Sequence, residues 1–155
     1  MFTTSNPSDF DAVLSGVQPT VSAEMNEALT REFRAEEVQQ ALKQMAPHTA
    51  PGPDGMSSIF YKSFWHIVGD DVTSTVLNAL NSGTIHDSLN STFISLIPKL
   101  KNPKRVADFR PISLCNVVYK LIAKVLVNQM KLVLSHVVSD SQSAFLSGRQ
   151  CTCSF

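Results

Sequence analysis

Residues 92–116 have the sequence TFISLIPKLKNPKRVADFRPISLCN and contain the clearest strand pattern of the chain. Phe93 to Ile97 favour a strand because they are mostly apolar or β-favouring, and Pro98 blocks its continuation. After a polar turn at residues 101–104, Asp108 to Leu114 favour a second strand. We therefore predict a β-hairpin with a long basic tip.

Helical spacing of apolar residues predicts helices before and after this hairpin. The fold class is α+β and mostly helical, with the hairpin followed by the longest helix. Residues 50–55 must form a loop, because Pro and Gly alternate there too densely for regular structure. The predicted helices are 23–29 with Ser22 as N-cap, 35–45 ended by Pro47, 57–68, a helix capped by Asp70 and stopped by residues 81–83, and 117–134.

The composition is that of a globular chain. Of 155 residues, 43% are hydrophobic and 17% charged, which suits one domain. No window approaches the ~20 apolar residues of a membrane span, and the N-terminus lacks a signal-peptide pattern. We expect an intracellular, soluble protein without a membrane partner, in a compartment that the sequence does not specify. Cys151 and Cys153 have no histidine at zinc-ligand spacing, so no metal site is predicted.

The net charge of zero is a cancellation between two halves of the chain. Residues 1–90 carry four basic and eleven acidic side chains, a net of −7, whereas residues 91–155 carry nine basic and two acidic ones, a net of +7. Five of the cations lie between Lys99 and Arg110. Such a cluster can bind a polyanion. It can equally be a solvated basic turn, and the charge count alone leaves both interpretations open.

Six short motifs follow one another at compatible spacings. They are APGPDG at 50–55, FYK at 60–62 with Trp65, LNST at 89–92, LIPK at 96–99, DFRPISLCN at 108–116 with Tyr119 and Lys120, and QSAF at 142–145 with Gly148 and Arg149. The chain resembles the N-terminal, or fingers, part of the reverse transcriptase domain of plant non-LTR (LINE-type) retrotransposons. The resemblance covers roughly residues 25–150.

This resemblance implies an incomplete right-hand polymerase domain at residues 22–150. It would follow a loosely ordered arm at 1–21 and precede an aberrant tail at 151–155, which lacks the helical periodicity of the family. The implied partners are an RNA template with its DNA primer and a deoxynucleoside triphosphate. The complete enzyme of this family would require Mg²⁺.

The resemblance also implies where the nucleotide binds. The lysine after the first finger strand and the arginine that opens the second contact the triphosphate in this family, and the matching residues are Lys99 and Arg110. A guanidinium forks onto phosphate oxygens and an ammonium acts as a point charge. In the alternative interpretation, Arg110 pairs with Asp108 and Lys99 is solvated. Further candidate contacts to a nucleic-acid backbone are Lys101, Lys104, Arg105 and Arg149.

Catalytic residues are not predicted in this chain. Phosphoryl transfer needs metal ions held by carboxylates from separate elements. The acidic pairs at 36–37 and 70–71 are explained as helix-start residues, and those at 9 and 11 lie in the arm. The resemblance places the catalytic aspartates beyond Phe155. We therefore expect the chain alone to be inactive and to bind no Mg²⁺.

Three functions remain as hypotheses. The first is a fragment of an RNA-directed DNA polymerase that keeps nucleotide-phosphate and template contacts. The second is a non-catalytic nucleic-acid-binding module that uses residues 91–155. The third is an inactive retroelement relic, whose apolar face along 117–134 would be exposed and favour self-association.

Overall fold

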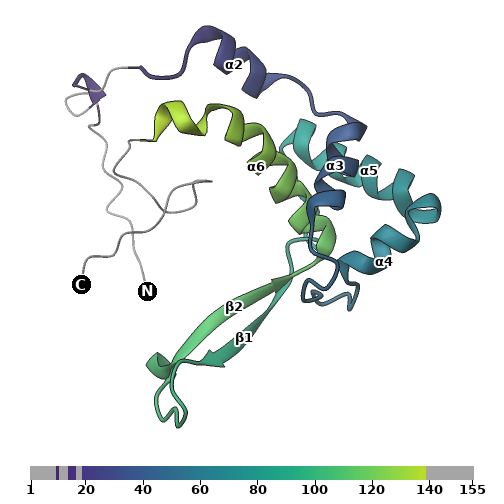
Figure 1. The fold of residues 1–155 in the computed structure, drawn as a ribbon, viewed down its shortest axis with the longest axis vertical. Coiled ribbons are helices and arrows are strands. Elements are labelled where there is room, and N and C mark those ends of the chain that lie inside the picture. Colours follow the sequence, from purple (N-terminus) through teal and green to yellow (C-terminus); the bar gives the residue numbers. More distant parts are fainter. Residues whose placement is uncertain (1–9, 11–13, 17–18, 139–155) are drawn as a thin grey trace. The chain divides into compact units, whose positions relative to one another are not determined.

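The computed structural model describes residues 10, 14–16 and 19–138. The chain divides into two units, residues 31–130 and a smaller unit formed by residues 1–30 and 131–155. The described part is α+β, with five helices and two strands (Figure 1). In chain order the elements are α2 (Ala23–Thr30), α3 (Ala35–Gln44), α4 (Ser58–Ser63), α5 (Trp65–Ser82), β1 (Thr92–Pro98), the 3-10 turn η1 (Val106–Asp108), β2 (Phe109–Cys115) and α6 (Val117–Val137).

The predicted hairpin is present and extends away from the helices of the larger unit (Figure 1). β1 and β2 are antiparallel, with a register that runs from Thr92 opposite Cys115 to Pro98 opposite Phe109. The second strand begins one residue later than predicted. Asp108 instead closes η1, where its N–H donates to the carbonyl of Arg105 at 2.9 Å.

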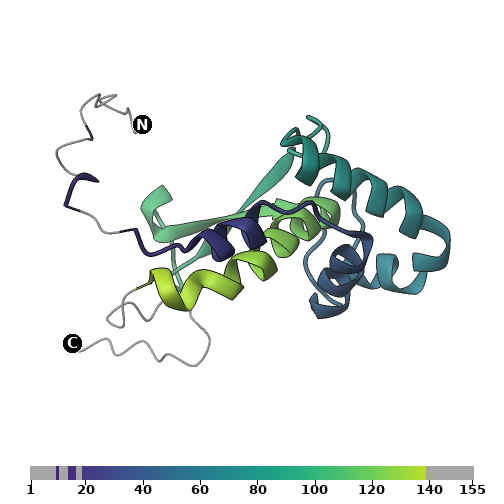
Figure 2. The same cartoon turned by 90° about the horizontal axis from the view of Figure 1, so that it is seen from above.

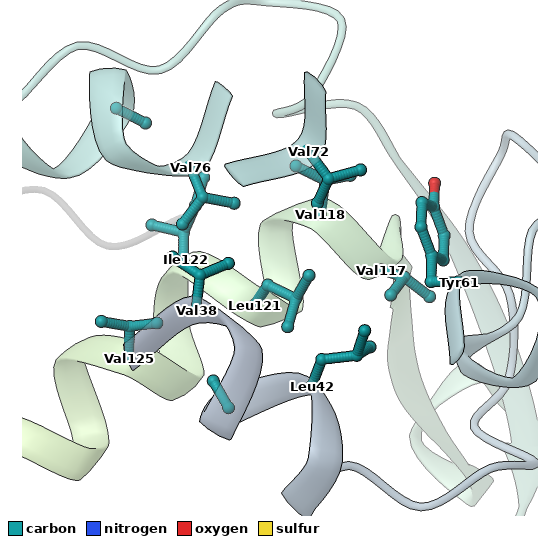
Figure 3. Close-up of a cluster of buried hydrophobic side chains, with 12 residues drawn as sticks. Val38, Leu42, Tyr61, Val72, Val76, Val117, Val118, Leu121, Ile122 and Val125 are labelled. Carbon is teal, nitrogen blue, oxygen red and sulfur yellow. The ribbon is translucent and has the colours of Figure 1, made fainter. Parts of the chain in front are cut away.

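The core of the larger unit lies where α3, α4 and α5 gather around the N-terminal half of α6 (Figure 2). Val38, Val76 and Leu121 are fully buried and come from three different helices. Figure 3 shows the side chains of this cluster converging. The cluster consists of Val38, Ala41, Leu42, Tyr61, Val72, Val76, Ala79, Val117, Val118, Leu121, Ile122 and Val125. Burial at these helical spacings stabilises all four helices together.

The predicted helix at 57–68 is helical over most of its length but is divided in two, and the predicted cap at Asp70 was wrong. The break falls at Phe64, whose φ of −107° and ψ of 20° interrupt the helix between α4 and α5. α5 then continues through Gly69 and Asp70. A Cβ on Gly69 would lie 2.9 Å from Cε2 of Trp65, so the indole ring packs against the backbone at this glycine. The Gly-Asp pair therefore marks a close contact rather than a helix boundary.

Other helix ends match the sequence. Ser22 caps α2 as predicted, since its Oγ accepts the N–H of Met25 at 3.2 Å. α5 stops at Gly83, which has a φ of +71° that favours glycine. α6 ends three residues later than predicted, at Val137. None of the helices in the described part is long and apolar enough to cross a membrane.

The apolar stripe of α6 is only partly covered. Leu121, Ile122 and Val125 are buried, whereas Leu126 and Met130, which the pattern placed on the same stripe, are exposed. The expected exposure of apolar residues on this helix is therefore seen at its middle. Most of the predicted arm and the whole predicted tail lie outside the described residues.

Leu121→Ala should lower the free energy of unfolding by about 2–5 kcal/mol, because it opens a cavity in the fully buried cluster. The matched control is Leu126→Ala on the same helix, where the side chain is 41% exposed and a much smaller change is expected. Urea unfolding followed by circular dichroism measures both. Equal losses in the two variants would show that α6 does not pack as described.

Candidate nucleic-acid interface

The hairpin register places Lys99 and Arg110 on one face. Arg110 lies opposite Ile97. The pairing continues one step past β1, because the N–H of Lys99 donates to the carbonyl of Asp108 at 2.7 Å. Side chains alternate between the two faces of a strand, so Lys99 shares the face of Ile97 and is the diagonal neighbour of Arg110. An anion on this face can contact both cations.

Asp108 does not neutralise Arg110. Its carboxylate Oδ2 accepts the backbone N–H groups of Lys104 and Arg105, each at 2.9 Å. These two bonds lower the pKa of Asp108, so the carboxylate stays charged and belongs to the turn. Within the described residues the structure has one salt bridge, between Arg31 and Glu37. The alternative in which Arg110 pairs with Asp108 is therefore not observed.

Lys99 is exposed but held in place. Its Nζ donates to the carbonyl of Ala107 at 2.8 Å, across the tip of the hairpin. An ammonium group has three donors, so two remain for an anion. The bond restricts the side chain and holds its ammonium group beside Ala107, on the tip side of the residue pair Lys99 and Asp108. Lys99 is therefore more ordered than the simple solvated lysine of the alternative interpretation.

The tip of the hairpin is basic and exposed. Lys101, Lys104 and Arg105 are exposed, and their charged groups form no salt bridge with any described residue. Apolar side chains lie beside them, with Val106 81% exposed. The tip therefore offers unneutralised positive charge to a polyanion. Arg149, the fourth predicted backbone contact, lies outside the described residues.

Two lysines that had no assigned role connect segments of the larger unit. The Nζ of Lys120 donates to the carbonyl of Ala50 at 2.5 Å, and the Nζ of Lys62 donates to the carbonyl of Met45 at 2.6 Å. Both lysines belong to the six sequence motifs, and that membership is the feature by which the sequence could have identified them. Their contacts are structural, because each ammonium satisfies a carbonyl at the end of a helix or in the loop at 50–55.

The described part of the chain has no cluster of metal-ligating side chains. No group of three His, Cys, Asp or Glu side chains in it could hold a metal ion. Cys151 and Cys153 lie outside the described residues.

Asp108→Ala should loosen the tip without unfolding the helices, because Lys104 and Arg105 lose the acceptor of their N–H groups. In the unchanged chain, Lys104 and Arg105 are expected to lose the same carboxylate acceptor at low pH, when Asp108 is protonated. Because the pKa of Asp108 is lowered, its carboxylate stabilises the tip fully above the ordinary pKa range of aspartate. This stabilisation disappears as the pH falls through the lowered pKa. Amide exchange by NMR at Lys104 and Arg105 measures both effects. Protection that survives Asp108→Ala would contradict this role, and Asp87→Ala is the control.

Comparison with known proteins gives one informative match. No protein-family model matches the chain. Over 131 residues it is 32% identical to an uncharacterized 149 kDa protein of transposon TX1 from Xenopus laevis. The match covers 84% of this chain and 10% of that protein, so the chain spans about a tenth of the length of this curated relative. The chain is thus similar to one segment of a transposon protein, which supports a transposon-related origin.

Proposed function

We propose that this chain is the fingers part of a retrotransposon reverse transcriptase, in which one face of the hairpin binds the triphosphate of the incoming deoxynucleotide. The observation that carries the proposal is the register, which puts Lys99 and Arg110 on the same face. The similarity to a transposon protein supports the transposon-related origin in this proposal.

The two cations have complementary tasks in this proposal. The Arg110 guanidinium donates two parallel hydrogen bonds to oxygens of one phosphate, while the Lys99 ammonium adds a point charge. The bond from Lys99 to Ala107 reduces the number of side-chain conformations that binding must restrict. Pro98 and Pro111 flank the pair and limit the backbone there. The face thus binds and orients a triphosphate.

The tip cations serve a different ligand in the proposal. Lys101, Lys104 and Arg105 contact the phosphate backbone of the template and primer, and Arg149 does so from outside the described residues. Contacts of this kind position a nucleic acid without reading its sequence. No bond-making step is assigned to any of these residues, since the described side chains include no metal-holding group.

A second candidate function is a nucleic-acid-binding module without nucleotide binding. The exposed tip favours it, because Lys101, Lys104 and Arg105 are exposed there together with Leu100 and Val106. The two functions differ in one measurable property. Only the first requires a triphosphate to bind at Arg110.

Arg110→Ala should weaken binding of thymidine triphosphate roughly tenfold or more, because charge-assisted hydrogen bonds contribute about 1.5–3 kcal/mol. Isothermal titration calorimetry on the purified chain measures the affinity. The control is Lys43→Ala, which removes one exposed positive charge from α3 and should change little. Equal weakening by both variants would indicate general charge attraction. Unchanged binding in Arg110→Ala would overturn the nucleotide site.

The double variant Lys104→Ala with Arg105→Ala should weaken binding of an RNA–DNA duplex and reduce its salt dependence. Each lost phosphate contact should lower the slope of log affinity against log salt by about 0.7–0.9. Fluorescence anisotropy with a labelled duplex at several salt concentrations gives the slope. An unaltered slope would exclude the tip as the nucleic-acid contact, and Lys43→Ala again serves as the control.

A further inference from the structure

Three segments of the larger unit meet at Asn116, the residue between β2 and α6. Its side chain is only 6% exposed, and a buried amide needs hydrogen-bond partners. Oδ1 accepts the N–H of Asp54 at 3.3 Å, and Nδ2 donates to the carbonyl of Ser88 at 3.4 Å. One side chain therefore connects the loop at 50–55, the turn before β1 and the end of β2.

Gly52 makes this meeting sterically feasible. A Cβ at Gly52 would lie 2.3 Å from Oδ1 of Asn116, 2.4 Å from its backbone N and 2.6 Å from the carbonyl carbon of Cys115. Two of these three atoms are backbone, so they cannot rotate away. One turn further along α6, Lys120 donates to the carbonyl of Ala50. The loop is thus held against the base of the hairpin at two points.

Apart from Leu89, which packs against the core just before β1, few other contacts constrain the direction of the hairpin. Its two strands form a sheet with each other alone among the described residues, and most of their side chains are exposed. Ser88 precedes β1 and Asn116 follows β2, so the bond between them closes the base of the hairpin. The bond to Asp54 then attaches that base to the loop between α3 and α4.

We infer that Asn116 is a positioning residue, which fixes the direction of the hairpin relative to the helices of the larger unit. Through that direction it sets where the face with Lys99 and Arg110 lies. The consequence for nucleotide binding rests on the proposed function. The geometric part does not, because it concerns the hairpin and the helices alone.

The geometric part is tested by measuring the distance between the tip and α5. Spin labels are attached to a keto-bearing unnatural amino acid at positions 101 and 74, which leaves Cys115 unchanged, and pulsed electron resonance gives the distance distribution. We expect a narrow distribution in the unchanged chain and a clearly broader one in Asn116→Ala. The matched control is Asn128→Ala on α6, which should keep the narrow distribution.

Two further variants keep the test decisive if Asn116→Ala does not fold. Asn116→Asp keeps an acceptor for Asp54 and loses the donor to Ser88, so an intermediate width is expected. Lys120→Met removes only the bond to Ala50 and should broaden the distribution less. A narrow distribution in every folded variant would overturn the inference.

Nucleotide affinity separates the two proposals. If both hold, Asn116→Ala weakens thymidine triphosphate binding several-fold although Lys99 and Arg110 are intact, and Asn116→Asp recovers part of the loss. If the unchanged chain binds no triphosphate, the proposed function fails, and the distance distributions still decide the role of Asn116. If Asn116→Ala broadens the distance distribution but binds thymidine triphosphate as tightly as the unchanged chain, the direction of the hairpin does not affect nucleotide binding, and that part of the inference is contradicted.

Discussion

Leu121 packs with Val38 and Val76 in the centre of the larger unit, and the position of the hairpin depends on this contact. α6 begins two residues after β2 ends, so the burial that holds α6 also holds the end of the second strand. Apolar burial is the dominant favourable term in folding, and here it acts mainly on the helices. The hairpin gains its place in the fold through its connection to α6 rather than through a core of its own.

The acidic and the basic residues of the chain belong to different elements of the fold. The acidic half of the sequence forms α2 to α5 and contains the described salt bridge, between Arg31 and Glu37. The basic half forms the hairpin and α6. The carboxylate within the hairpin tip, that of Asp108, is bound by backbone N–H groups and forms no salt bridge with a described cation. Positive charge therefore remains available on the hairpin even though the whole chain is neutral.

Local patterns in the sequence predicted the hairpin, the positions of three helices (α2, α3 and α6) and the cluster of cations, because these depend on near neighbours. They failed at Phe64 and Gly69, because the apolar spacing continues across the break at Phe64 and a Gly-Asp pair resembles a helix start even where Trp65 packs on the glycine one turn later. The resemblance singled out Lys99 and Arg110, but their common face follows from the register, which the sequence did not specify. Pairing of Arg110 with Asp108 therefore stayed open. The role of Asn116 was invisible because Asp54 is 62 residues away in sequence.

An isolated two-stranded hairpin is marginally stable in water, so its attachment to the fold affects both its order and its direction. Phe93, Ile94 and Leu96 are exposed on β1, and burial therefore contributes little along the ribbon. The order comes instead from the ladder between the strands and from the bonds at the two ends. At the tip, Asp108 holds the turn. At the base, Asn116 joins the two strands to the loop at 50–55. In the proposed site, freedom at either end of the ribbon would add an entropic cost to the binding of one phosphate group by two cations, so fixing both ends favours binding.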